Sequence, residues 1–343
     1  MEKSKMLLVA LGQGAGNIVD GLLSRNKSYN GIFFNSNLFD IKPLKNAIID
    51  KNVYLYPGAD GSGRDRNKSK EMIMDNANAI GTLLRKYPQT EVMVIFTSMA
   101  GGTGSGAIKT FIQIASAAIP TTKINVVAIL PSLTEDQLSF KNTIECWNDI
   151  NGVIDLVNDI KFIDNNKRNT YKEVNNEVVE SLDLAYNLMG VHADGNIDKK
   201  DSFRINTADG AGLVLKLYDG LKDAKTAIDF AIKNSVFAQP DMYDCDYLGI
   251  NLKVDGYDPN QISKCFEVYK STYMTYNDAF NIVVLGGCET PTESIKLVKM
   301  ALDDKSKRKL SRDKKRSVII NFDDENINKE INSGREEMEF SFD

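Results

Sequence analysis

The sequence contains few residues of the kinds that build metal centres and disulfide frameworks. Its 343 residues include one histidine, His192, and four cysteines, at positions 146, 245, 265 and 288. No two cysteines form a C-x-x-C pair, which argues against a zinc site and a disulfide framework. We expect His192 to lie in a loop, and no G-x-S-x-G motif supplies a serine for Ser-His-Asp catalysis. The chemistry must therefore depend on carboxylates, amides and backbone N–H groups, with or without a hard metal ion.

Long apolar runs are also absent. No stretch of 18 uncharged apolar residues occurs, and the apolar run from Met6 to Leu11 is shorter than the core of a signal peptide. We therefore expect a cytoplasmic protein that does not contact a membrane. Its length and its apolar content of 42% are sufficient for one large or two modest domains.

The charge is unevenly distributed, although the net charge is only −5. Residues 296–316 contain ten Lys or Arg against three Asp, a net charge of +7, whereas residues 317–343 contain eight acids against two bases, a net charge of −6. A segment as polar as the second cannot bury enough surface to offset the entropy of ordering. The sequence predicts a basic helix over 291–316 and an acidic, largely disordered tail over 317–343.

Short β-branched runs alternate with helical segments over residues 1–168, which predicts a doubly wound α/β domain with a parallel sheet. The strands are expected at 5–11, 31–35, 52–56, 91–97, 123–130 and 159–163, and the helices at 16–24, 66–86, 107–117 and 136–150. Val174, Val178 and Leu182 recur at helical spacing, which predicts one long central helix within 169–192. Residues 193–290 are expected to form a smaller α+β domain, with strands at 212–218, 246–254, 271–276 and 281–285 and helices at 220–234 and 259–266.

A first glycine loop, Gly12-Gln13-Gly14-Ala15-Gly16-Asn17, follows the first strand and precedes a helix. Such a turn exposes backbone N–H groups that can bind a phosphate. It is not the dinucleotide-binding fingerprint, because the glycines run G-x-G-x-G and the second strand ends in Asn35-Ser36-Asn37 without an acid for a ribose hydroxyl.

A second glycine loop, Ala100-Gly101-Gly102-Thr103-Gly104-Ser105-Gly106, follows the strand near 91–97. It lacks the lysine of a Walker loop. A triphosphate here would depend on backbone N–H donors, two helix N-termini, the hydroxyls of Thr103 and Ser105, and Mg²⁺. The alternative is two tight turns whose glycines only permit close packing.

These two loops resemble the phosphate loops of the tubulin/FtsZ superfamily. Ala100–Gly106 resembles its signature GGGTG[ST]G, with Ala100 replacing the first glycine, and the resemblance extends over residues 5–290. Leu130–Asp136, Cys146–Ile150 and Asp164–Arg168 are most similar to the TubZ-type tubulins of plasmids and clostridial phages. The resemblance implies a tubulin-like fold, in which a doubly wound GTP-binding domain is joined by a long central helix to a smaller α+β domain.

The resemblance also implies a site for GTP or GDP with Mg²⁺. Gln13 would approach the Mg²⁺, which phosphates and water also hold, Glu135 would accept from the ribose hydroxyls, and Tyr171 would stack on the base. Asn165 and Asn175 would read the guanine edge, although Asn165 could equally belong to a turn. The residues expected around the nucleotide are Gly12, Gln13, Gly14, Asn17, Asn35, Gly101, Gly102, Thr103, Gly104, Ser105, Glu135, Asn165, Tyr171 and Asn175.

The segment Asn196-Ile197-Asp198-Lys199-Lys200-Asp201 resembles the family's catalytic pattern N-x-D-x-x-D. If a helix starts here, the carboxylates of Asp198 and Asp201 share one face and could bracket a water. Without the resemblance, the same residues are typical of a solvated helix start. With it, Asn196, Asp198 and Asp201 would complete the nucleotide site of the next subunit, so that assembly stimulates hydrolysis.

The function implied by the resemblance is a GTPase that polymerises head to tail into cytomotive filaments and segregates plasmid or prophage DNA. The acidic tail would contact a DNA-bound, TubR-like adaptor, and we do not expect the basic helix to contact DNA directly. Three alternatives remain open. They are a phage tubulin that positions capsids or DNA, a cell-division FtsZ, which the lack of a short apolar peptide closing the tail disfavours, and a non-hydrolysing nucleotide-sensing module.

Overall fold

One ten-stranded sheet runs through the part of the chain that the computed structural model describes, which is residues 1–57, 60–192, 195–254, 256–277 and 279–316. Its first half is parallel and has the strand order β3-β2-β1-β4-β5-β6. The strands are β1 (Met6–Leu11), β2 (Asn30–Asn35), β3 (Val53–Leu55), β4 (Val92–Ser98), β5 (Lys123–Leu130) and β6 (Asp159–Asp164). β1 is buried along its whole length because helices cover both faces of the sheet. The predicted doubly wound α/β fold is confirmed.

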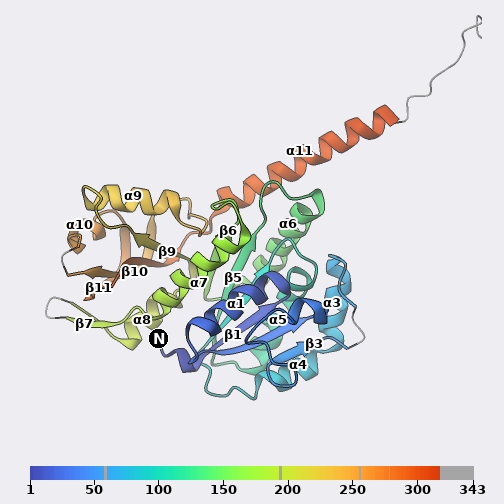
Figure 1. The fold of residues 1–343 in the computed structure, drawn as a ribbon, viewed down its shortest axis with the longest axis horizontal. Coiled ribbons are helices and arrows are strands. Elements are labelled where there is room, and N and C mark those ends of the chain that lie inside the picture. Colours follow the sequence, from blue (N-terminus) through green and yellow to red (C-terminus); the bar gives the residue numbers. More distant parts are fainter. Residues whose placement is uncertain (58–59, 193–194, 255, 278, 317–343) are drawn as a thin grey trace, which may run out of the picture. The chain divides into compact units, whose positions relative to one another are not determined.

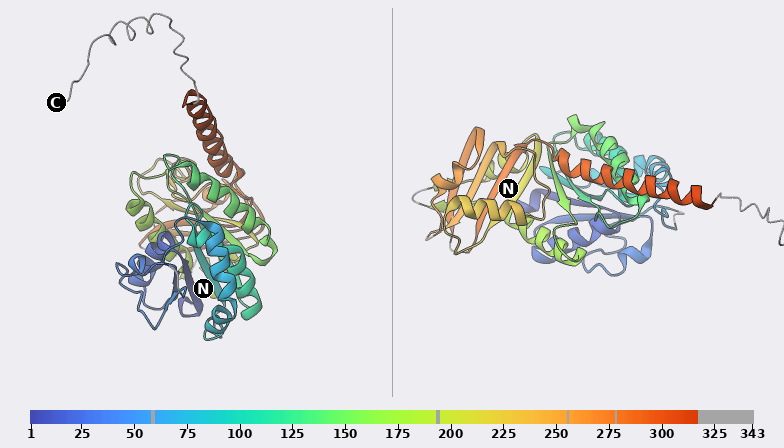
Figure 2. Two further views of the ribbon diagram at one scale, coloured as in Figure 1. Left: turned by 90° about the vertical axis from the view of Figure 1, so that its right-hand side faces the viewer. Right: turned by 90° about the horizontal axis from the view of Figure 1, so that it is seen from above.

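Helices cover both faces of this parallel half (Figures 1 and 2). α1 (Gln13–Arg25), α2 (Leu38–Ile41) and α7 (Tyr171–Tyr186) pack on one side, and α3 (Arg66–Asp75), α4 (Ala77–Leu84), α5 (Thr103–Ala118) and α6 (Gln137–Asn151) pack on the other. Two short 3₁₀ helices lie at Lys3–Lys5, before β1, and at Ile154–Leu156, between α6 and β6. The crossover direction therefore changes between β1 and β4, which are neighbouring strands.

The second half extends the same sheet rather than forming a separate one. β9 (Gly210–Leu217) pairs with β6 in parallel, and β12 (Asn281–Cys288) lies antiparallel between β9 and β10 (Asp244–Lys253), with β11 (Glu267–Asn277) at the edge. The remaining helices are α8 (Lys199–Asn206), α9 (Ala224–Asn234), α10 (Pro259–Ser263) and α11 (Thr292–Arg316). The sheet and the helices before α11 belong to one compact unit, Met1–Leu302.

Four local features differ from the sequence predictions. The segment 66–86 is two helices separated at Asn76, whose side chain donates to the Met72 carbonyl and so caps the first helix. α2 was not predicted, and α7 ends at Tyr186 instead of continuing to 189. His192 is not in a loop but in β7 (Gly190–His192), which pairs with β8 (Gly195–Ile197). Short strands and one-turn helices carry too few residues for a periodic signal.

Two further expectations concern the absence of membrane contact and the disorder of the acidic tail. No helix among the described residues is long and apolar enough to cross a membrane. The acidic tail, 317–343, lies outside the described residues, and its disorder stays a prediction.

A buried ion pair lies where the two halves of the sheet join. Lys161 Nζ is 2.6 Å from Asp159 Oδ2, and the two side chains are 0% and 1% exposed. Both lie beside Gly212 of β9, where a Cβ would come within 2.2 Å of the carboxylate. Burial raises the pKa of Asp159, and the Lys161 ammonium opposes that shift. The carboxylate therefore depends on its lysine to remain ionised.

Replacing Lys161 with methionine should lower the free energy of unfolding by about 3–5 kcal/mol, because it leaves a buried carboxylate without its partner. Asp159 should then bind a proton in the folded state above its ordinary pKa. Stability therefore falls as pH rises, and the deficit should shrink when the variant is measured at pH 5 instead of pH 7. Denaturant titration checks both effects. The control is Lys216→Met, which breaks the half-exposed pair with Glu180 and should cost less than about 1 kcal/mol. Equal costs for the two variants would contradict this account.

Candidate functional site

A cavity of about 760 Å³ opens at the carboxyl ends of β1 and β4, where the crossover direction changes. Doubly wound sheets bind their ligands at this position, and the volume falls within the range of roughly 300–1,000 Å³ for small-molecule sites. The first turns of α1 and α5 line it, so two helix N-termini direct N–H groups toward it. Its lining is Leu11, Gly12, Gln13, Gly14, Asn17, Ser36, Asn37, Asp40, Gly61–Arg64, Ser98, Ala100–Gly104, Ile129, Glu135, Asp136, Asn165, Tyr171 and Asn175.

The glycines of the two loops are required by close backbone contacts. Gly12 caps α1 with a φ of +83°, a conformation that L side chains rarely adopt. A Cβ on Gly104 would lie 2.3 Å from the Leu11 carbonyl oxygen, and one on Gly102 would lie 2.6 Å from Arg64 Cα. The first loop, the second loop and the 61–64 segment are therefore packed directly on one another. These contacts do not exclude phosphate binding, because the N–H groups of both helix starts still face the cavity.

Ala100, which replaces a family glycine, fits its position without strain. The residue is buried, and it does not have a positive φ, since among the described non-glycine residues only Asp50 and Arg64 do. Its carbonyl accepts a hydrogen bond from Asn142 Nδ2 at 3.2 Å. The methyl group therefore does not distort the loop.

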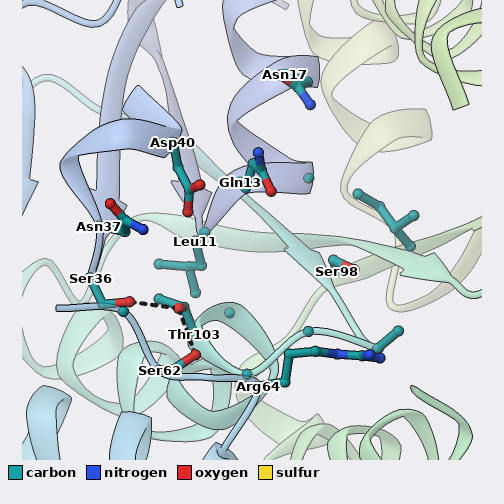
Figure 3. Close-up of a pocket in the computed structure, with 18 of the residues that line it drawn as sticks. Leu11, Gln13, Asn17, Ser36, Asn37, Asp40, Ser62, Arg64, Ser98 and Thr103 are labelled. Carbon is teal, nitrogen blue, oxygen red and sulfur yellow. Dashed lines mark hydrogen bonds between the residues drawn. The ribbon is translucent and has the colours of Figure 1, made fainter. Parts of the chain in front are cut away.

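Three hydroxyl groups form a chain at one side of the cavity (Figure 3). Thr103 Oγ1 lies 2.9 Å from Ser36 Oγ and donates to Ser62 Oγ at 3.2 Å. Figure 3 also labels Gln13, Asn37 and Asp40, which line the same cavity. The hydroxyl of Thr103 thus ties the second glycine loop to the ends of two other segments.

Ser105 and Asn35 do not line the cavity, and the place predicted for both around the nucleotide stays a prediction. Ser105 is fully buried, its hydroxyl donates to the Gly101 carbonyl, and Arg66 donates to its carbonyl at 3.0 Å. Asn35 is 1% exposed, and its Oδ1 accepts from the Asn37 N–H at 3.1 Å. Both residues hold the loops in place from behind. Neighbouring residues of a helix or a strand point their side chains in different directions. The motif alone therefore could not predict which side chains face the cavity.

Polar and aromatic side chains gather at the start of α7. Tyr171 Oη donates to Glu135 Oε1 at 3.0 Å, and the Ser132 N–H donates to the same oxygen. Burial, together with the nearby Glu135 carboxylate, raises the pKa of Tyr171, so the phenol remains a donor. The turn after β6 is closed by Asn166, whose N–H donates to Asp164 Oδ1 at 2.9 Å. Asn165, like Asn175, lines the cavity.

Sequence reasoning did not assign site roles to several lining residues, including Asp40 and the pair formed by Arg64 and Asp136. Arg64 Nη1 lies 2.6 Å from Asp136 Oδ2, and this guanidinium lowers the pKa of Asp136 to about 2, helped by the Ser139 N–H. Asp136 is also the N-cap of α6. The one sequence signal is the glycine-rich sequence Gly-Ala-Asp-Gly-Ser-Gly at 58–63, which directly precedes Arg64.

The described residues contain no group of three or more His, Cys, Asp or Glu side chains that could hold a metal ion by themselves. Mg²⁺ usually keeps several waters and is bound by one or two protein oxygens plus substrate phosphates. Gln13 and Asp40 both line the cavity and offer such oxygens. The donor set therefore fits Mg²⁺ delivered together with a polyphosphate.

The acids predicted to be catalytic lie at the far end of α7 from the cavity. Tyr171 starts α7 and lines the cavity, whereas the carbonyl of Ala185, at the other end, accepts from Asn206 of α8 (Figure 1). α7 has 16 residues, so it separates the two ends by about 24 Å. Asn196, Asp198 and Asp201 therefore take no part in the cavity of their own subunit.

Asp198 and Asp201 form a capping box at the start of α8. Asp198 Oδ1 accepts from the Asp201 N–H at 2.9 Å, and Asp201 Oδ2 accepts from the Asp198 N–H at 3.2 Å. The backbone N–H groups of Asp201 and Lys200 lower the pKa of Asp198, which keeps it ionised. Asn196 lies in β8 opposite Val191, which is 89% exposed. Asp198 and Asp201 therefore cap α8, and Asp198 is exposed, whereas Asp201 is partly buried and pairs with Arg204.

Comparisons with known proteins agree with this geometry. Residues 5–170 match the Tubulin/FtsZ family, GTPase domain. The chain is 31% identical to the "Tubulin-like protein TubZ" of Clostridium botulinum C phage over 98% of its own length and 94% of that protein. It superposes on the tail-truncated TubZ of Clostridium botulinum phage c-st with a TM-score of 0.82 and 28% identity, covering 90% of this chain and 100% of that one. A GTPγS-form protofilament of TubZ from Bacillus thuringiensis serovar israelensis gives a TM-score of 0.76 at 16% identity over 90% and 94% of the two chains, a likeness of fold alone.

Proposed function

Because this chain belongs to the tubulin/FtsZ family and is a TubZ homologue with a GTPase domain, we propose that it hydrolyses GTP in an active site completed by two subunits. The observation that carries this proposal is the separation of the cavity from Asp198 and Asp201 by the length of α7. The cavity supplies phosphate and base contacts. The acids that fit the family's catalytic pattern are then available only to the cavity of another subunit.

In the cavity, the N–H groups at the starts of α1 and α5 bind the phosphates of GTP or GDP, with the hydroxyl of Thr103. Glu135 accepts from the ribose, Tyr171 stacks on the base, and Asn165 and Asn175 select guanine by offering both donors and acceptors. Mg²⁺, when bound with the phosphates near Gln13 and Asp40, neutralises charge on them. Because the backbone N–H groups at the starts of α1 and α5 hold the negatively charged phosphates, the site does not need the lysine of a Walker loop.

The second subunit approaches with the start of α8. Asp201, Asp198 and Asn196 orient a water for in-line attack on the γ-phosphate, and the cavity's N–H groups stabilise the charge that develops. Exposed apolar side chains support such a contact at both ends of the molecule. Phe39 (73% exposed) adjoins lining residue Asp40, and Val191 lies beside Asn196. A contact between two different faces that does not close into a ring produces a filament.

We place this filament in the cytoplasm of a bacterial host, where it moves plasmid or prophage DNA. The negative tail, 317–343, would carry the contact with a DNA-bound, TubR-like adaptor, whose basic surface it complements. The 31% identity to a phage TubZ over nearly the whole chain supports this role. The test is a pull-down with a TubR-like adaptor, which we expect the full chain to retain and a chain that ends at 316 to lose.

Phosphate release from Mg·GTP should depend on protein concentration. We expect almost no release below a threshold concentration and a steep rise above it, because each complete site requires two subunits. A colorimetric phosphate assay over a dilution series, with light scattering to detect filaments, checks this. A rate per subunit that does not change with dilution would show a self-contained site, and the shared-site proposal would fail.

The capping box favours a second candidate function, a non-hydrolysing nucleotide sensor. In that case Asp198 and Asp201 only start α8. One oxygen of each carboxylate accepts from a backbone N–H group, and Asp201 Oδ1 also pairs with Arg204. The same assay separates the two functions. A sensor retains bound GTP at every protein concentration, with or without filaments.

A further inference from the structure

The cavity carries little positive charge for a site that is proposed to bind a polyphosphate. Among the described residues that line it, Arg64 is the one cation, whereas Asp40, Glu135 and Asp136 are acids. A nucleoside triphosphate carries several negative charges, which repel this lining. Arg64 is therefore the side chain from which the phosphates can gain most, provided that it can turn toward them.

The backbone of Arg64 is fixed against the second glycine loop. Its carbonyl accepts from Asn142 Nδ2 at 3.1 Å, and the same amide group donates to the carbonyls of Ala100 and Gly101. Its Cα fills the space that a Cβ on Gly102 would need. Arg64 also has a φ of +65°, a strained value for a side chain of this size. Strain of this kind persists where the surroundings impose it, and it clusters at ligand sites.

The side chain of Arg64, in contrast, is held only at its tip. Its Nη1 and Nη2 donate to Asp136 Oδ2 and Oδ1 at 2.6 and 3.3 Å, and Nη2 also contacts Ser139 Oγ. The side chains of Arg64 and Asp136 are 42% and 56% exposed. An ion pair this exposed changes an equilibrium constant by less than about fivefold, so a stronger acceptor can displace it.

We propose that Arg64 exchanges partners when nucleotide binds, releasing Asp136 and Ser139 and donating to the phosphates. This inference rests on the proposed binding of GTP in the cavity. A guanidinium matches the oxygens of a phosphate with two parallel hydrogen bonds, and such bonds are stronger than those to an exposed carboxylate. Asp136 holds the side chain in the cavity while nucleotide is absent. The exchange also removes the Arg64 contacts from Asp136 and Ser139 at the start of α6. Nucleotide binding in the cavity therefore changes the contacts of that helix.

A double-mutant cycle on Arg64 and Asp136 tests the exchange. The readout is the equilibrium affinity for GTPγS, measured by calorimetry below the concentration at which filaments form. Arg64→Gln should weaken binding about 10–100-fold, because a charge-assisted contact to phosphate is lost. Asp136→Asn should tighten binding about 2–5-fold, because the competing acceptor is removed while asparagine still caps α6. In the Arg64→Gln background, Asp136→Asn should improve the affinity for GTPγS by a factor at least about twofold smaller than in the wild-type background. Only the repulsion between the carboxylate and the phosphates is then relieved.

The outcomes separate the possible explanations. A purely structural ion pair would make both single variants bind more weakly, and pure repulsion would give Asp136→Asn the same gain in both backgrounds; either result overturns the exchange. If the wild-type protein does not bind GTPγS, the proposed function fails first and the inference fails with it. Arg64→Gly relieves the left-handed strain and replaces Arg64→Gln in the cycle if the latter is unstable. Lys141→Gln removes an exposed charge from α6 outside the cavity and should not change affinity.

Discussion

Replacing Asp201 with alanine is expected to reduce assembly-stimulated phosphate release by about 10²–10⁴-fold, the usual contribution of a positioned acid or base. Nucleotide affinity should not change, because Asp201 lies at the opposite end of α7 from the cavity. Filaments should still form with GTP and should persist longer than those of the wild-type protein. Phosphate release, nucleotide affinity and light scattering on the same preparation check the three expectations.

The capping box makes a matched control necessary. Asp201 Oδ2 accepts from the Asp198 N–H, so alanine also weakens the start of α8, at a cost of about 0.5–2 kcal/mol. Asp201→Asn keeps an acceptor at this position and removes the charge. If charge on Asp201 matters for hydrolysis, both variants lose activity although only alanine lowers the unfolding temperature. Wild-type rates for Asp201→Asn would show that the residue is a cap and no more.

Gly104→Ala should abolish nucleotide binding, with a loss of at least about 100-fold in affinity. The new Cβ would lie 2.3 Å from the Leu11 carbonyl oxygen and 2.7 Å from Thr97 Oγ1, and neither atom belongs to a flexible side-chain end. The two glycine loops must then separate. Alanine is intrinsically better than glycine inside a helix by about 1 kcal/mol, so helix propensity alone predicts a change in the opposite direction. Calorimetry with GDP measures the effect.

The matched control for Gly104→Ala is Gly101→Ala in the same loop. There the nearest atom to an added Cβ is the Ser98 carbonyl oxygen at 3.8 Å, an ordinary contact. This variant should bind GDP within a few-fold of the wild-type protein. If both variants bind equally well, the packing of the loops is not what places the phosphate donors.

The parallel half of the fold was predictable because most of its strands are short apolar, β-branched runs that alternate with helices of normal size. The meeting of the two glycine loops followed from topology, since β1 and β4 are neighbours whose crossovers run in opposite directions. The continuity of the sheet was not predictable. It depends on a short parallel contact between β6 and β9, at the buried Lys161 and Asp159, and no local pattern encodes a pairing between strands so distant in sequence.

The candidate site was predictable where backbone geometry dictates residue type and not where side chains meet across segments. The glycines and Gln13, Asn17, Glu135, Asn165, Tyr171 and Asn175 all line the cavity. Arg64 and Asp136 lie 72 positions apart, and neither belongs to a pattern that predicts an ion pair. Ser105, the third residue of α5, points into the protein because neighbouring side chains of a helix point in different directions. Motifs therefore identified the loops, and the fold decided which of their side chains face inward.

The separation of the cavity from α8 by the length of α7 has a consequence for nucleotide exchange in the proposed filament. Every contact between two subunits inside a filament would enclose one nucleotide between the cavity of one subunit and the α8 of its neighbour. This nucleotide could exchange with nucleotide in solution only after that contact opens. The two ends of a filament would be chemically different, since one presents an open cavity and the other presents the start of α8 with Asp198 and Asp201. Each subunit would then hydrolyse one GTP after it is enclosed in the filament, and it would bind a new GTP only after release.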